Sequence, residues 1–222
     1  MNTRPAWGAL TLGALIVIGL LLSPIWLQQF SGYFKEAEEV APFPEDFYLL
    51  SNQAQDVYMD LYENSSEQMA IDLVAARLAD PVDVEDPNLP ALDEIPTEVT
   101  LALTGSFNTL DAIRLSGGTA NIYQLSDGQW IVRLESLDAV NGPEMRVLLS
   151  AHARPTTRGD LDQVMQFEID LGELKGSQGN QNYFITSPTF NIENYMDGSS
   201  VVLYSARYEL IFSFASLAPP EQ

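Results

Sequence analysis

Uncharged positions dominate the start of the chain. No charged side chain lies between Arg4 and Lys35, a stretch of 30 residues, and residues 6–27 are almost all apolar. About 20 helical residues are enough to cross the hydrocarbon layer of a bilayer. We therefore expect residues 1–34 to form a short N-terminal tip and a transmembrane anchor, which contacts the membrane through residues 6–27. The alternative is a cleaved signal peptide, but such peptides have a shorter apolar core and a small-residue cleavage site.

The charges on either side of this segment predict its orientation. Arg4 precedes it, whereas all 31 acidic residues and only 8 basic residues lie from Glu36 onward, which gives that part a formal charge of −23. Because basic residues favour the cytoplasmic side, we expect a single-pass membrane protein with a cytoplasmic N-terminus and an extracytoplasmic C-terminal domain. The negative charge repels phosphate backbones, so we expect no nucleic-acid binding. Solubility, attraction of cations or a basic partner are all compatible with it.

Apolar residues then recur at spacings of three and four, the period of an amphipathic helix. This pattern runs from Pro44 to about Tyr62 and predicts a first helix. Ser65 and Gln68 have the spacing of a capping box, which predicts the start of a second helix. We expect residues 35–79 to form a short helical hairpin that packs on itself or on the following domain. A surface for docking a partner is the alternative.

Residues 80–97 show neither period. They contain four prolines and six acidic residues, a composition typical of an extended, semi-rigid connection. We expect this segment to be a linker between the hairpin and the C-terminal domain.

Beyond Glu98 apolar and polar residues alternate, as in half-buried strands. The alternating positions form four groups: Val99, Leu101 and Leu103; Trp130, Val132 and Leu134; Phe167, Ile169 and Leu171; and Tyr208, Leu210, Phe212 and Phe214. Turns are indicated at 126–128 and 141–143, and a Gly-rich loop at 176–180. We expect a mainly β fold, with an all-β sandwich or barrel-like domain at 98–218 preceded by the transmembrane helix and the hairpin.

The absence of cysteine limits the chemistry. Without cysteine the chain has no disulfides, thiolate metal sites or thiol nucleophiles. The single histidine, His152, makes a multi-histidine metal centre or a conventional catalytic triad hard to assemble. His152 is a candidate haem ligand, with Met145, Met165 or Met196 as partner, and an ordinary surface-loop histidine is the alternative.

Several motifs occur together in the C-terminal half. They are Gly105-Ser106-Phe107, Leu115 to Ala120, Asn141-Gly142-Pro143 followed by Arg146 to Ser150, Asp170 to Tyr183, Val201 to Tyr204, and Phe212 to Leu217. In this combination residues 104–217, about half of the chain, resemble the electron-transfer "DM thirteen" domain family. The resemblance implies an all-β, extracytoplasmic domain. The family's electron-transfer role rests on a cysteine where this chain has Ser205, and a hydroxyl cannot shuttle electrons, so the resemblance does not imply redox activity here.

Two groups of polar residues are candidate binding sites. The first is the amide-rich loop, with Lys175, Gln178, Asn180, Gln181, Asn182 and Tyr183 as its candidate binding residues. Its glycines and amides also suit a tight loop that satisfies its own backbone. The second comprises the carboxylate pairs Asp160 with Asp162 and Asp170 with Glu173, which are candidates for a cation site or a solvated acidic surface. Ser205 lacks a recognisable base partner, so we interpret it as a strand-end hydroxyl rather than a nucleophile.

These observations favour a membrane-anchored, extracytoplasmic binding protein or accessory subunit without catalytic activity, bound cofactor or metal, that contacts protein partners. The alternative is an electron-transfer protein with a non-covalently held cofactor such as haem. Recognition of a small ligand or carbohydrate is a third hypothesis, which rests on analogy with other β-sandwiches alone.

Overall fold

The computed structural model describes residues 42–87, 89 and 99–221. Within these ranges no helix is long and apolar enough to cross a membrane, and the expected anchor at residues 6–27 lies outside them. The elements, in chain order, are η1 (Glu45–Leu49), α2 (Asn52–Asn64), α3 (Glu67–Leu78), β1 (Asp83–Glu85), β2 (Thr100–Ser106), β3 (Ser116–Gln124), β4 (Trp130–Ala139), β5 (Met145–Ser150), α4 (Arg158–Asp162), η2 (Met165–Phe167), β6 (Ile169–Glu173), β7 (Gln178–Phe184), η3 (Ile192–Tyr195), β8 (Ser199–Ser205) and β9 (Leu210–Leu217).

The N-terminal helices begin later than the sequence pattern predicts. The expected first helix is divided into the 3-10 turn η1 and the α-helix α2, because the Ser51 side chain accepts a hydrogen bond from the Ala54 N–H and starts a new helix there. The cap of α3 is Ser66, which accepts from the Met69 N–H, rather than the predicted Ser65. Ser65 instead ends α2.

The two helices pack against the β domain. Phe47, Tyr58 and Leu73 are buried and belong to the same hydrophobic cluster as the inner residues of the sheets. At the junction the Asp72 carboxylate accepts a 2.6 Å hydrogen bond from the Tyr208 hydroxyl. The hairpin therefore contributes to the core, so of the two expected arrangements, packing on itself or on the following domain, the structure shows contact with the domain.

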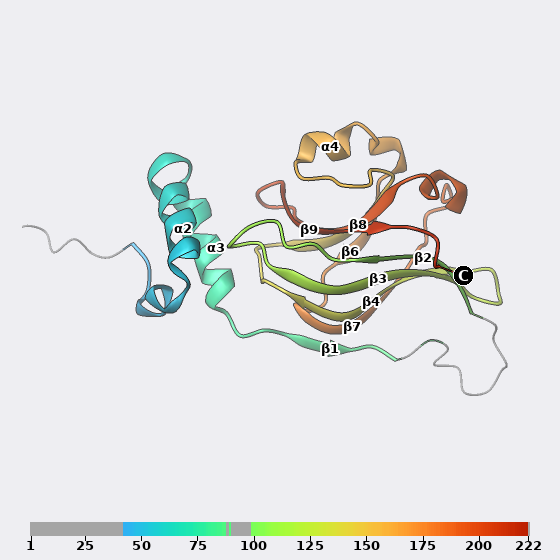
Figure 1. The fold of residues 1–222 in the computed structure, drawn as a ribbon, viewed down its shortest axis with the longest axis horizontal. Coiled ribbons are helices and arrows are strands. Elements are labelled where there is room, and N and C mark those ends of the chain that lie inside the picture. Colours follow the sequence, from blue (N-terminus) through green and yellow to red (C-terminus); the bar gives the residue numbers. More distant parts are fainter. Residues whose placement is uncertain (1–41, 88, 90–98, 222) are drawn as a thin grey trace, which may run out of the picture. The chain divides into compact units, whose positions relative to one another are not determined.

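The C-terminal part is mainly β and contains two sheets, which lie face to face (Figure 1). One sheet, which we call the inner sheet, has five strands in the order β1-β7-β4-β3-β2, and the other, the outer sheet, has four in the order β6-β5-β8-β9. Isolated bridges from Thr104 to Ala218 and from Phe107 to Ala215 join β2 to β9 along one side. The sheets thus form a sandwich that is closed on this side by backbone contacts.

The two turn predictions are confirmed, with different consequences. At 126–128 the chain makes a hairpin between β3 and β4, in which the Leu125 N–H donates to the Gln129 carbonyl at 2.8 Å. At 141–143 the chain passes from β4 in the inner sheet to β5 in the outer sheet, so this turn connects the two sheets and not two paired strands.

Two sequence predictions about irregular segments are wrong. The Gly-rich stretch 176–180, expected as a loop, enters the strand β7, and part of the expected linker forms the strand β1, which pairs with β7 in parallel. A row of amides and glycines does not show the apolar alternation of a typical strand, so the sequence does not indicate that this stretch forms a strand or that it pairs with β1. The domain expected to be all β also contains the short helices α4, η2 and η3.

A second, smaller hydrophobic cluster lies on the side of the outer sheet that faces away from the sandwich. It joins Leu161 of α4 to residues of β5, β8 and β9, namely Leu148, Val202, Tyr204, Ile211 and Phe214. Helix α4 therefore covers part of this face, as Figure 1 shows. The rest of the face is available to form a surface groove.

Candidate binding groove

A surface groove on the outer sheet is lined by two residues that pair across adjacent strands. Arg146 of β5 and Tyr204 of β8 lie directly opposite each other in the antiparallel ladder. Both interrupt apolar strands, and directly opposed residues in a ladder project to the same face of the sheet. Arg146 and Tyr204 thus line a groove on the outward face of the outer sheet, together with Leu148 and the exposed Ala206.

Arg158 at the start of α4 forms one wall. Its guanidinium lies 5.6 Å from the centroid of the Tyr204 ring, which is within the range of a cation–π interaction. The same side chain contacts Asp162 at 2.8 Å and Glu168 at 3.2 Å. Burial lowers the pKa of Arg158, but the neighbouring Glu168 and Asp162 carboxylates outweigh burial and raise it above its ordinary value. Arg158 thus stays charged and connects α4, the segment before β6, and β8.

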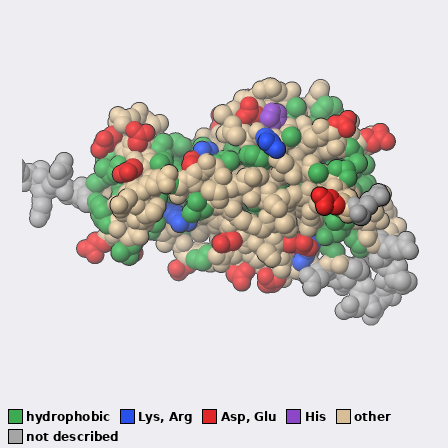
Figure 2. Space-filling model, in the orientation of Figure 1, with side chains coloured by type: hydrophobic (Ala, Val, Ile, Leu, Met, Phe, Trp, Pro, Cys, Tyr) green, Lys and Arg blue, Asp and Glu red, His purple; other side chains and the backbone are tan. Residues whose placement is uncertain are grey.

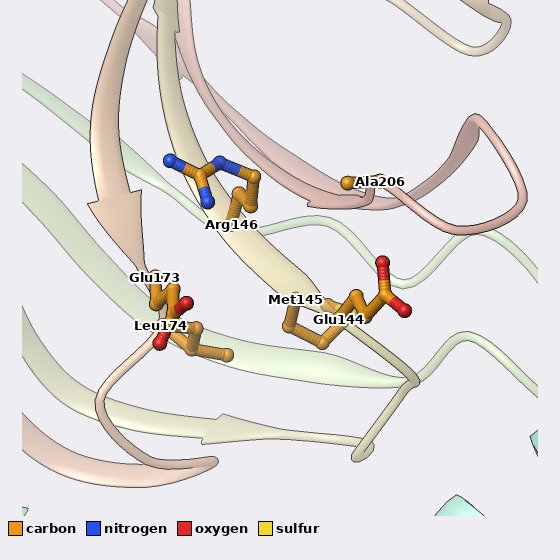
Figure 3. A pocket seen from close by; sticks show the side chains of 6 residues that line it. All are labelled: Glu144, Met145, Arg146, Glu173, Leu174 and Ala206. Atoms are coloured by element: carbon orange, nitrogen blue, oxygen red, sulfur yellow. The ribbon is translucent and has the colours of Figure 1, made fainter.

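Arg146 forms the wall opposite Arg158, where it pairs with Asp170 of β6. Its Nε lies 2.7 Å from Asp170 Oδ2, and this hydrogen bond is the main reason that the pKa of Arg146 lies above its ordinary value. Past Arg146 the groove continues between the start of β5 and the end of β6. Figure 3 shows Glu144 and Met145 on one side, Glu173 and Leu174 on the other, and Ala206 across from them.

The two parts of the groove adjoin each other through Arg146 and Ala206, and their volumes are about 420 and 460 Å³. We call the combined surface the outer groove. Six carboxylates line it, from Glu144, Asp162, Glu168, Asp170, Glu173 and Glu209, against the two guanidinium groups of Arg146 and Arg158. Figure 2 shows Asp and Glu side chains spread over one face of the molecule, with few Lys or Arg side chains between them. The outer groove is thus an open, polar surface with a formal charge of −4, suited to a cationic ligand.

Ser205, which the resemblance aligns with a cysteine, is buried. Ser205 is 0% exposed and ends β8, where its hydroxyl donates a 2.6 Å hydrogen bond to the Pro143 carbonyl. This bond connects the end of β8 to the turn before β5. The structure therefore places Ser205 in a structural hydrogen bond, in agreement with our interpretation of it as a strand-end hydroxyl.

His152 lies in a partly exposed turn after β5. Its Nδ1 accepts a 3.3 Å hydrogen bond from the Arg154 N–H, and its carbonyl accepts one of 2.7 Å from the Ser200 hydroxyl. Among the described residues no group of three or more His, Cys, Asp or Glu side chains is arranged to hold a metal ion. The structure does not join His152 to the outer groove, whose lining residues are all different ones.

The predicted binding residues of the amide-rich segment divide between the interior and the edge of the inner sheet. Gln181 and Tyr183 are buried, and both accept hydrogen bonds from the Lys175 N–H, at 3.2 and 3.1 Å. Gln178, Asn180 and Asn182 lie along β7, where the last two contact the segment that contains β1. The expected binding loop is therefore a strand whose edge is already occupied by another part of the same chain.

The predicted carboxylate pairs have local partners. Asp160 accepts hydrogen bonds from the Thr156 and Thr157 N–H groups, both at 2.9 Å, and forms a capping box at the start of α4. These bonds lower the pKa of Asp160 to about 2. Asp162 and Asp170 pair with the two groove arginines, so the structure assigns them to the walls of the outer groove.

Sequence reasoning missed Arg146, Arg158 and Tyr204. A signal for the first existed, since Arg146 follows Met145 and precedes Val-Leu-Leu in an otherwise apolar strand. No sequence signal shows that Arg146 and Tyr204 become neighbours, because 57 residues separate them and only the strand register joins them.

The comparisons with known proteins return little. No family model and no curated protein matches the chain. A solved structure of Cu(II) superoxide dismutase 5 from Candida albicans is similar with a TM-score of 0.38 and 11% sequence identity, over 55% of this chain and 94% of that one.

Proposed function

We propose that this chain is a membrane-anchored, extracytoplasmic binding protein, without catalytic activity of its own, that docks a basic segment of a partner protein in the outer groove. The observation that supports the proposal is the lining of the outer groove, where six carboxylates surround two arginines. Charge complementarity of this kind increases association rates and excludes partners of the wrong charge.

The two arginines also hold three of the groove's carboxylates in fixed positions. Each is held by carboxylates at 2.7 to 3.2 Å, so Asp162, Glu168 and Asp170 are positioned by the protein itself. Glu144 is different, since its side chain is 62% exposed and its nearest basic group, Arg207, is 3.9 Å away. A lysine or arginine of the partner therefore finds a more available carboxylate at Glu144 than at the three paired ones.

The location of the groove fits the expected topology. The anchor at residues 6–27 would place everything after it outside the cytoplasm, and the resemblance to the "DM thirteen" domain supports the same side. On this proposal the β domain is a scaffold that presents the outer groove, and the helical hairpin connects the scaffold to the membrane segment.

The test compares charge reversals inside and outside the outer groove. Wild-type chain, the groove variant Glu144→Lys/Glu173→Lys and the control Glu63→Lys/Glu67→Lys are each isolated in mild detergent from the native membrane. The control makes the same change in net charge at exposed positions of α2 and α3. We expect a protein partner with an exposed basic segment to accompany the wild type and the control but not the groove variant. An identical set of proteins with all three chains, or no associated protein, would contradict the proposal.

A further inference from the structure

Arg207 lies between the helical hairpin and the outer groove. It belongs to the turn between β8 and β9 and directly follows Ala206, which lines the groove. Its guanidinium lies 2.8 Å from the Asp72 carboxylate of α3 and 3.9 Å from the Glu144 carboxylate of the groove. The first distance is that of a close ion pair, and the second is at the limit of one. Arg207 thus pairs with the hairpin although a groove carboxylate is within its reach.

Asp72 is held in place by the residues around it. One of its carboxylate oxygens accepts a 2.7 Å hydrogen bond from Gln68 Nε2, and the other accepts one of 2.6 Å from the Tyr208 hydroxyl. These two bonds are the main reason that the pKa of Asp72 lies below its ordinary value. Asp72 therefore stays charged and presents its carboxylate to Arg207 in a fixed position.

Tyr208 holds the Arg207 side chain on the same side. The Arg207 guanidinium lies 5.6 Å from the centroid of the Tyr208 ring, which is within the range of a cation–π interaction. The hydroxyl of the same ring donates to Asp72. Tyr208 and Asp72 together therefore keep the guanidinium close to α3.

The backbone keeps Glu144 near Arg207 whichever carboxylate the arginine pairs with. The Glu144 carbonyl accepts a 3.0 Å hydrogen bond from the Ala206 N–H, and the preceding Pro143 carbonyl accepts one of 2.6 Å from the Ser205 hydroxyl. These bonds join the turn before β5 to the end of β8. The position of the Arg207 side chain, and not that of the backbone, therefore determines whether the Glu144 carboxylate is paired.

We propose that Asp72 is a positioning residue of the outer groove, which retains Arg207 at α3 and thereby leaves the Glu144 carboxylate open to a basic partner. The inference rests on the proposed function, because it concerns the same groove. When the Asp72 charge is removed, the ion pair with Glu144 is the one described for Arg207 that remains. That pair occupies a carboxylate that the partner would otherwise contact. The helical hairpin thus determines, through one arginine, how many carboxylates the groove offers.

The test measures the binding of a dye-labelled hexalysine peptide to the full-length chain in an uncharged detergent. The variant is Asp72→Asn, because asparagine keeps an oxygen that accepts from the Tyr208 hydroxyl and loses the charge that holds Arg207. Asp60→Asn is the matched control, since the exposed Asp60 of α2 is bonded to Asn64 and loses the same charge on the hairpin. We expect Asp72→Asn to bind the peptide about two- to fivefold more weakly than the control, which is the effect of one exposed ion pair.

Two further chains distinguish positioning from a general structural effect. Asp72→Asn/Arg207→Gln has the net charge of the wild type and should bind the peptide like the wild type, because the arginine that would pair with Glu144 is gone. In a chain that carries Glu144→Gln, adding Asp72→Asn should weaken binding no more than adding Asp60→Asn does, since the carboxylate through which Asp72 acts is already absent.

The inference is overturned if Asp72→Asn binds the peptide like the control, if Arg207→Gln does not restore the binding, or if the loss persists in the Glu144→Gln chain. In each of these cases, weaker binding by the groove variant Glu144→Lys/Glu173→Lys still supports the proposed function. If that groove variant binds the peptide as tightly as the wild type, the proposed function fails and this inference fails with it.

Discussion

The Arg158 guanidinium lies over the ring of Tyr204, 5.6 Å from its centroid. Because Arg158 also pairs with Asp162 and Glu168, this one side chain connects α4, the segment before β6 and strand β8. We conclude that Arg158 orders one wall of the outer groove in addition to contributing to its charge.

Replacing Arg158 should therefore affect both stability and binding. We expect Arg158→Ala to lower the free energy of unfolding by about 1 to 2 kcal/mol, since it removes a cation–π contact and partly exposed ion pairs. Urea unfolding measures this loss. The exposed Arg154 is the matched control, and Arg154→Ala should leave the stability within about 0.5 kcal/mol of wild type. Equal effects of both substitutions would contradict the role given to Arg158.

The closed side of the sandwich depends on a glycine. A Cβ atom at Gly105 would lie 2.1 Å from the Ser216 carbonyl oxygen, so any side chain there pushes β2 away from β9. We expect Gly105→Ala to lower the free energy of unfolding by about 3 kcal/mol or more. Gly117→Ala is the control, because no atom lies within 4 Å of the added methyl group. Thermal unfolding of the two variants measures the difference, and similar melting temperatures would argue against the closure.

The burial of Ser205 makes a prediction about the cysteine of the resembling family. Because this position is 0% exposed, the thiol of Ser205→Cys should react with a maleimide only when the chain unfolds. The substitution should also cost about 1 kcal/mol, since the hydrogen bond to the Pro143 carbonyl is weakened. A thiol that reacts in the native chain as fast as one placed at the exposed Glu63 would show that the end of β8 is open.

Alternation allowed much of the outline of the β domain to be predicted from the sequence. The groups at Trp130 to Leu134 and Leu210 to Phe214 fall in β4 and β9, although both strands bury consecutive residues, 131–134 and 211–215, and therefore both faces. Tyr208 and Phe167 were assigned to strands but lie just before them, in a turn and in η2. The alternation of apolar and polar residues continues past the end of a strand, whereas the backbone hydrogen bonds that define the strand stop there.

What escaped prediction depends on contacts between distant segments. Strand β1 has three residues and two of them are acidic, so nothing in its local pattern indicates a strand, and only pairing with β7 makes it one. Helix α4 has five residues, too few to show a helical period. The outer groove was missed for the same reason, since the ladder between β5 and β8 brings Arg146 to Tyr204.

Buried tyrosines should determine the stability at high pH. Burial raises the pKa of Tyr58, Tyr183 and Tyr195 to about 12 from 10.0. The pKa of each tyrosine is therefore higher in the folded chain than in the unfolded chain. Its contribution to the free energy of unfolding is complete below about pH 10 and is lost as the pH rises toward 12, by about 2 to 3 kcal/mol for each tyrosine. Urea unfolding across this range measures the loss. Tyr58→Phe should reduce it by roughly one third, and an unchanged loss would contradict the prediction.

A photo-crosslinking residue in place of Ala206 tests the central claim most directly. Ala206 lines both parts of the outer groove, and its exposed position tolerates a larger side chain. On illumination of cells that make the full chain, we expect one main adduct at position 206, joined to a basic segment of another protein. The same residue at Glu63, on the exposed side of α2, should not form this adduct. No adduct at position 206, or the same adduct from both positions, would contradict the proposal that the outer groove binds a basic partner.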